Sequence, residues 1–177
     1  MSIFKRLAGR SGSALTELVI AITLSTIMLG SIFALYTNGK DKATMTKAEQ
    51  GLFDAVENIR TYYMFEGSYA GISSLTAEDF YTKDFFQRSW VCSGEKTIVC
   101  KGPGDIQVSF TGTTKKFKMS LKNLTEAQCL TLSQIDYHNV HSVKINKTTF
   151  TPPIATSDVV TNCSLAKRKN VITTTLY

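Results

Sequence analysis

An apolar run near the start of the chain constrains the fold more than any other feature of the sequence. Residues 18–35 are eighteen consecutive positions without an ionisable side chain. As an α-helix, such a run spans roughly 27 Å, close to the thickness of the hydrocarbon layer of a bilayer. We therefore expect a membrane-inserted helix here, with the remainder of the chain carried beyond it.

The residues that precede the run have their own pattern. Residues 1–12 contain Lys5, Arg6 and Arg10 and no acid, and they end at a small pair, Gly12-Ser13. Glu17 lies five residues after Gly12, at the edge of the apolar run. A carboxylate at the edge of a membrane helix is costly unless it has a partner, and is therefore a functional candidate. The pattern indicates a removable basic leader, residues 1–12, on a permanent helix.

Two simpler interpretations stay open at this point. An ordinary secretory signal has a shorter apolar core and a small-residue cleavage site after that core, whereas the small pair here comes before it. A plain signal anchor would keep its leader, and Glu17 would then be an interfacial charge with no assembly role. Hydropathy alone does not separate the anchor from a cleaved helix.

The segment RSGSALTEL, residues 10–18, resembles the processing site of type IV prepilins. The resemblance implies that a prepilin peptidase cuts after Gly12 and methylates the new amino terminus at Ser13. It also makes Glu17 the acid at the fifth position of the mature chain. Ser13 departs from the Phe of the commonest subclass, and the leader is longer than is usual there, so both features favour a type IVb-like subclass.

Physical chemistry gives Glu17 a role in such a helix. A lone carboxylate and a lone α-ammonium are both expensive among apolar stems. Pairing Glu17 of one subunit with the Ser13 amine of a neighbour satisfies both charges and fixes the axial register between subunits. Breaking a pair of this kind costs about 3–5 kcal/mol. We therefore expect a homo-oligomeric helical filament assembled through residues 13–38.

Residues 39–177 are expected to form one globular head domain. The formal net charge of the whole chain is +6, and loss of the three leader cations lowers it to +3. This is too modest for nucleic-acid binding, which calls for a clustered basic patch, so no nucleic-acid partner is predicted.

The head is predicted to have an α+β pilin fold, with one long helix packed on an antiparallel sheet. The helix should run from about residue 14 to 65, because an apolar stripe recurs at helical spacing (Met45, Ala48, Leu52, Val56, Ile59, Tyr63). Phe53, Tyr62 and Phe65 should widen that stripe, and Gly67 should stop the helix. Strands are expected over residues 97–100, 105–111, 115–121, 142–146 and 171–176. A short helix is expected over residues 125–135, with Thr125 as its cap.

The connector of residues 66–90 is rich in aromatic side chains. A short helix is expected over residues 74–80, because Thr76 and the acids that follow it resemble a capping box. The aromatic residues either cover the core or face a neighbouring subunit, and the first alternative is the expected one. They are Tyr69, Phe80, Tyr81, Phe85, Phe86 and Trp90.

All four cysteines follow the apolar run, which is consistent with an exported head. Four cysteines allow three pairings. We favour Cys92–Cys100, which closes a small hairpin-like loop, and Cys129–Cys163, which ties a short helix to the C-terminal region. A zinc site is the rival interpretation, but the chain has no Cys-x-x-Cys pair.

Catalytic chemistry is not indicated, and neither an enzyme activity nor a cofactor or metal is predicted. Asp136, His138 and His141 have the spacing of a weak metal site and are better explained as a surface loop. The cationic segment of residues 167–169 is most simply a solvated turn, with an anionic surface as the alternative contact.

The order of features in the C-terminal half also resembles a type IVb pilin: a Cys in a short helix, a strand, a proline-bearing loop, then Asn162-Cys163 and a terminal strand. The resemblance implies a precursor in the bacterial inner membrane that becomes the major subunit of an extracellular pilus, with the inner-membrane pilus assembly machinery as a further partner. Adhesion, aggregation or mating contact are the implied roles. The alternatives are a minor pilin or a pseudopilin of a type II secretion system, or a monomeric membrane-anchored periplasmic binding protein.

Overall fold

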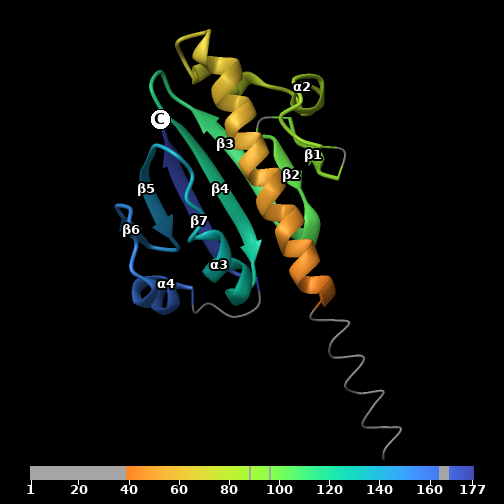
Figure 1. Ribbon diagram of the computed structural model, residues 1–177. Coiled ribbons are helices and arrows are strands. Elements are labelled where there is room, and N and C mark those ends of the chain that lie inside the picture. The colour runs from red at the N-terminus through yellow and green to blue at the C-terminus, as the bar shows by residue number, and fades with distance from the viewer. Residues whose placement is uncertain (1–38, 88, 96, 164–167) are drawn as a thin grey trace, which may run out of the picture. The chain divides into compact units, whose positions relative to one another are not determined.

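The computed structural model describes residues 39–87, 89–95, 97–163 and 168–177 (Figure 1). The chain divides into two compact units, Met1–Ala43 and Thr44–Tyr177, and the second, which is the head, is described below by itself. Within the described ranges, no helix combines the length and the apolar composition that crossing a bilayer requires. The apolar run of residues 18–35 lies outside those ranges.

A long helix occupies residues 39–64 of the described chain. The predicted stripe faces the core: Ala48, Leu52, Val56, Ile59 and Tyr63 are almost wholly buried. The helix ends where predicted, and the N–H of Gly67, which has a φ of 67°, donates to the Tyr63 carbonyl at 3.1 Å.

The prediction that Phe53 and Phe65 widen the stripe is wrong. Their exposed fractions are 37% and 84%. Phe53 is turned about 100° around the helix axis from the buried Leu52, and Phe65 lies past the last helical turn.

The connector contains a 3-10 helix, η1 (Ala70–Ser74), and a short α-helix, α2 (Ala77–Thr82). The expected capping box is present, with Thr76 and Asp79 exchanging side-chain and backbone hydrogen bonds. The helix begins later than predicted because the N-cap is Thr76, so Ser74 and Leu75 precede it. Phe80, Phe85, Phe86 and Trp90 are buried, as the core-covering alternative requires.

Seven antiparallel strands form one sheet, in the order β1-β2-β3-β4-β7-β5-β6. The C-terminal strand β7 lies between β4 and β5, so the end of the chain joins the two halves of the sheet. The strands are β1 (Val91–Ser93), β2 (Val99–Lys101), β3 (Gln107–Gly112), β4 (Phe117–Leu124), β5 (Val140–Ile145), β6 (Thr148–Phe150) and β7 (Asn170–Leu176). The long helix lies across one face of this sheet (Figure 1), so the predicted α+β arrangement of the head is present.

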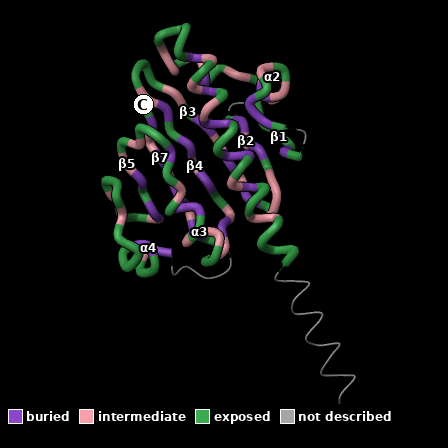
Figure 2. The backbone as a smooth tube through the Cα atoms, viewed as in Figure 1, coloured by how far each residue is buried: buried purple, intermediate pink, exposed green. Residues whose placement is uncertain are grey.

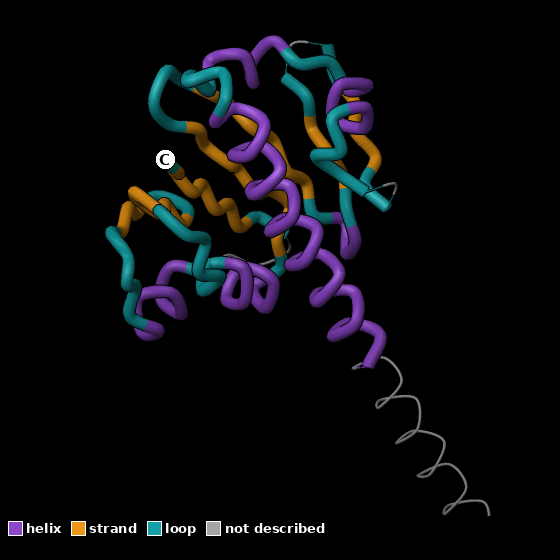
Figure 3. The backbone as a smooth tube through the Cα atoms, turned by 45° about the horizontal axis from the view of Figure 1, so that its top comes forward, coloured by secondary structure: helices purple, strands orange, loops and turns teal. Residues whose placement is uncertain are grey.

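Three further helices flank the strands: η2 (Pro103–Asp105), α3 (Glu126–Leu132) and α4 (Thr156–Asn162). The helices α3 and α4 lie at the same end of the sheet (Figure 3). The helix α3 has the predicted N-cap, Thr125, but ends three residues before the predicted Ile135. The strands β1 and β6 and the helix α4 were not predicted. Both strands have only three residues, and α4 has no side-chain cap to mark its start.

Alternate residues of each strand face opposite sides of the sheet. On β4, Phe117, Met119 and Leu121 are buried, whereas Lys118 and Lys122 are exposed. Figure 2 shows this alternation as changes of colour along the strands. We call the side under the long helix the covered face and the opposite side the open face.

Candidate functional site

The residues predicted to carry processing and assembly lie outside the described ranges. Gly12, Ser13 and Glu17 all fall within residues 1–38, as does the predicted assembly helix, residues 13–38. Their roles therefore stay predictions. The described residues form the head that such a helix would carry, and they show how the head holds the long helix.

Trp90 is the main contact between the long helix and the first half of the sheet. Its ring is 1% exposed, and it packs beside Phe86 with ring centroids 4.7 Å apart. Gly51 on the helix and Gly102 after β2 both approach it so closely that a Cβ at either position would lie 2.4 Å from a Trp90 ring atom. The two glycines are therefore explained by close packing rather than by backbone conformation.

Arg60 joins the same helix to the C-terminal half of the head. Its side chain is 13% exposed, and Nη1 pairs with Glu57 at 2.8 Å. Its Nε donates to the carbonyl of Tyr177 at 3.3 Å, and Nη2 donates to the carbonyl of His138.

The connector is held against a second flank of the helix. Asn58 Nδ2 donates to the Asp84 carbonyl at 2.7 Å, and Gln87 Nε2 donates to an Asp54 carboxylate oxygen at 3.3 Å. Lys83 donates to the Tyr62 hydroxyl and lies 4.0 Å from the centroid of that ring, and this hydrogen bond raises the pKa of Lys83. Asp54, Asn58 and Tyr62 are spaced four residues apart, so a single stripe of the helix makes all three contacts.

Two disulfides close the head, with the pairings favoured from the sequence. Cys92–Cys100 joins directly opposed residues of β1 and β2. Cys129–Cys163 joins α3 to the residue after α4, across 34 residues of chain. In the chain-entropy picture, a loop of this length contributes about 3–4 kcal/mol to stability.

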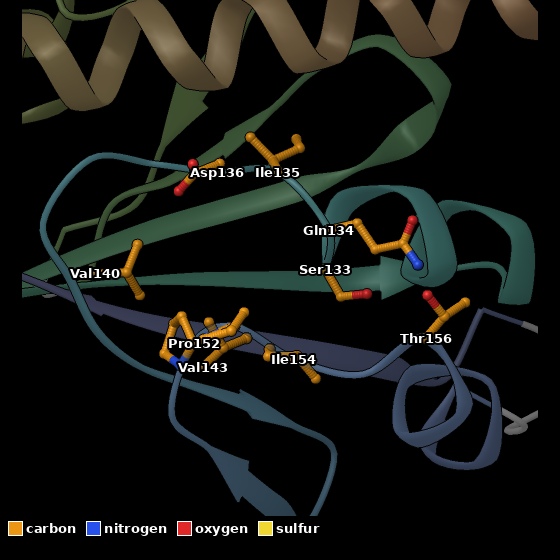
Figure 4. Close-up of a pocket in the computed structure, with 10 residues that line it drawn as sticks. Ser133, Gln134, Ile135, Asp136, Val140, Val143, Pro152, Ile154 and Thr156 are labelled. Atoms are coloured by element: carbon orange, nitrogen blue, oxygen red, sulfur yellow. The ribbon is translucent and has the colours of Figure 1, made fainter.

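A groove lies between the loop after α3 and the loop that precedes α4 (Figure 4). Its volume is about 580 Å³, and its walls include Ile135, Val143, Pro152 and Ile154. The Ser133 hydroxyl at its edge already donates to the Leu130 carbonyl at 3.1 Å. The groove can accept an apolar side chain, and its walls also carry the polar side chains of Gln134, Asp136 and Thr156.

The predicted surface-loop histidines have partners in this region. The Nδ1 atom of His141 lies 2.8 Å from the Tyr177 hydroxyl, and the His138 carbonyl accepts from Arg60. Among the described residues, no group of three or more His, Cys, Asp or Glu side chains is arranged to hold a metal ion. Tyr137 is buried beside them, and burial raises the pKa of its hydroxyl.

Arg168 is not simply a solvated turn residue, as the sequence suggested for its segment. Its guanidinium pairs with Asp105 at 3.0 Å and donates to the Gly104 carbonyl at 3.2 Å. Lys101 contacts the same carboxylate at 2.9 Å. The hydrogen bond and the charge of Lys101, together with the charge of Arg168, lower the pKa of Asp105. Arg168 thus ties the segment before β7 to the β2–β3 turn.

Comparison with known proteins gives one informative similarity. No protein-family model matches the chain. The chain is 27% identical over 127 residues to the toxin coregulated pilin of Vibrio cholerae. The match covers 70% of this chain and 57% of that relative, so it spans little more than half of the relative's length. The similarity supports the pilin resemblance.

Sequence reasoning missed the composition of the open face. The only signal for it was the alternation in residues 115–121, which placed Lys116 and Lys118 on the side away from the core. The pairing of the seven strands was needed to show which polar residues from other segments join them.

Proposed function

We propose that this chain is a structural subunit of a type IV pilus, of the type IVb-like subclass, and that it is the major pilin. The observation that carries the proposal is the similarity to toxin coregulated pilin over 70% of the chain. The prepilin-like segment of residues 10–18 is a second, local signal for it, because a processing site is recognised by the order of residues along the chain.

In this proposal the precursor sits in the inner membrane through residues 18–35. Prepilin peptidase removes residues 1–12 by cutting after Gly12 and methylates Ser13. The inner-membrane assembly machinery then moves the subunit into a helical filament outside the cell. The filament serves adhesion, aggregation or conjugative mating contact.

The head has the properties that a filament subunit needs. Its long helix is held by Trp90, by Arg60 and by the connector, at three places around the helix. Two disulfides close the head. A force applied along the helix is therefore passed to the sheet through several contacts, which supports a structural role under tension.

Glu17→Val, compared with Glu17→Asp, tests the proposal. The host carries the intact assembly machinery, and the readouts are the mass of the mature protein and the filaments recovered by shearing. Both variants and the wild type should begin at Ser13, because cleavage depends on the leader. Glu17→Val should give at most about one hundredth of the wild-type filaments, as expected for loss of a buried pair worth about 3–5 kcal/mol. Glu17→Asp keeps the charge and should retain part of the assembly.

Each alternative gives a different result. A chain that still begins at Met1 contradicts cleavage and favours the monomeric membrane-anchored protein. A chain cleaved before Ser13 that forms normal filaments with Glu17→Val contradicts the role of the carboxylate. If the cleaved protein is a trace component of sheared filaments, it is a minor pilin rather than the major one.

A further inference from the structure

The open face of the sheet carries an unusual set of side chains. A row of residues paired across four strands runs over its centre: Lys144 lies opposite Thr173, Thr173 opposite Ser120, and Ser120 opposite Ser109. The Ser120 and Thr173 hydroxyl oxygens are 3.3 Å apart. A neighbouring row continues the pattern with Thr111, Lys118, Thr175 and Ser142.

The charge on this face has a single sign. None of the seven strands contains an Asp or a Glu. The face presents four exposed lysines, Lys101, Lys118, Lys122 and Lys144. Lys101 is neutralised by Asp105 at 2.9 Å, whereas the other three form no ion pair with any described residue. An anionic partner would therefore meet three uncompensated cations and no repelling carboxylate on the strands.

The spacing of these cations favours an extended partner over a small anion. Lys118 and Lys122 are four residues apart on β4, which corresponds to about 13 Å at the rise of a strand. Lys144 is on β5, two strands away from β4, or about 10 Å. A single phosphate or carboxylate meets two of the three lysines only where both side chains bend toward it, and it leaves the third unpaired. A linear polymer with repeated negative charges can contact all of them at once.

The remaining side chains of the face indicate the kind of polymer. The three lysines are separated by hydroxyl and amide groups, which exchange hydrogen bonds with a polymer that is itself rich in hydroxyls. Apart from His141, whose ring packs edge-on against Tyr177, the strand residues on the open face include no aromatic ring on which a nucleobase could stack. They also include no Arg, the side chain best suited to bidentate phosphate recognition.

From these observations we propose that the open face of the sheet binds a linear acidic polysaccharide. Lys118, Lys122 and Lys144 contact its carboxylates, and the hydroxyls of Ser109, Ser120 and Thr173 contact its sugar hydroxyls. This binding surface is independent of filament assembly, since a single head contains all of it. In a filament, repeated heads would present the face many times and raise the avidity.

The test uses the full chain in detergent, with immobilised polygalacturonic acid as the probe. The face variant is Lys118→Gln/Lys122→Gln/Lys144→Gln. The matched control is Lys40→Gln/Lys42→Gln/Lys47→Gln, which removes the same charge from exposed residues of the long helix, outside the sheet. A third variant, Lys118→Arg/Lys122→Arg/Lys144→Arg, keeps the charge of the face. The fluorescence of Trp90, the only tryptophan of the chain, verifies that each variant is folded.

The face variant should bind at least about tenfold more weakly than the wild type, and its affinity should depend less on salt, because fewer counterions are released. The control variant and the Arg variant should stay within about threefold of the wild type. Neutral dextran should not bind.

Four results would overturn the proposal. They are an equal loss in the face and control variants, equal binding of dextran, no binding of polygalacturonic acid by the wild type, and a preference for a DNA duplex over the polysaccharide. The last would identify the face as a nucleic-acid surface instead. Because assembly is not measured, a failure here leaves the Glu17 experiment unaffected.

Discussion

The two faces of the sheet are built from the same strands and have opposite properties. On the covered face, Phe117, Met119 and Leu121 pack under the long helix, and Trp90 sits between two glycines. On the open face, Lys118 and Ser120 alternate with those apolar residues along the same strand. Seven acids lie instead on the helix and the connector, and Glu95 and Asp105 lie in the turns between strands. The seven are Glu49, Asp54, Glu57, Glu66, Glu78, Asp79 and Asp84. One strand thus supplies stability on one side and a contact surface on the other, so neighbouring residues should respond very differently to substitution.

The sharpest test of this comparison uses adjacent residues of β4. Met119→Ala should lower the free energy of unfolding by about 2–5 kcal/mol, because it leaves a cavity beneath the long helix. Ser120→Ala, on the open face, should change it by less than about 0.5 kcal/mol. Urea unfolding followed by Trp90 fluorescence measures both. Similar values for the two variants would contradict the division into a packing face and a contact face.

A smaller effect is expected where the helix meets Trp90. Gly51→Ala should be less stable than Gly39→Ala by about 1–3 kcal/mol, because the added methyl overlaps the Trp90 ring. A methyl added at Gly39 would meet no such atom within 4 Å, and both residues are helical. The gain in helix propensity is therefore the same in both variants and cancels in the difference. Thermal unfolding of the two proteins under one condition gives the comparison, and equal stabilities would show that Trp90 can move aside at little cost.

The smallest effect concerns the link from the helix to the C-terminal half. Arg60→Met keeps most of the aliphatic volume but loses the hydrogen bonds to the carbonyls of Tyr177 and His138. We expect a loss of about 1–2 kcal/mol. Lys118→Met on the open face removes a charge without removing such bonds and should have an effect below about 0.5 kcal/mol. If amide exchange in β7 becomes faster in Arg60→Met but not in Lys118→Met, the loss of stability lies at the C-terminal strand. Unchanged exchange in both variants would mean that Arg60 does not hold that strand.

Several elements of the head could be predicted because their signals are local. The buried stripe of the helix recurs every three or four residues, and Thr76 and Thr125 cap α2 and α3 as predicted. The strands β3, β4 and β7 alternate clearly enough to be found. In contrast, β1 and β6 are too short to show a period, and α4 has no side-chain cap. Phe53 and Phe65 were misplaced because hydrophobicity was given more weight than angular position on the helix.

The candidate functional residues also divide into those with a local signal in the sequence and those without one. Gly12, Ser13 and Glu17 were predicted from their order in the chain, since a processing signal is read along a sequence. The contacts of Arg60 could not be found, because its carbonyl partners lie 78 and 117 residues away. The open face was equally hidden, because its lysines and hydroxyls come from strands that are distant in the sequence.

The sequence by itself determined the apolar run, the basic segment before it, the periodic face of the long helix and the caps of two short helices. All of these depend on residues within a few positions of one another, where spacing alone fixes which side chains can meet. Only the tertiary structure decided that β7 pairs between β4 and β5, that Trp90 packs between Gly51 and Gly102, and that Lys118, Lys122 and Lys144 share one face. These depend on which strands pair, and strand pairing is set by the packing of the whole core.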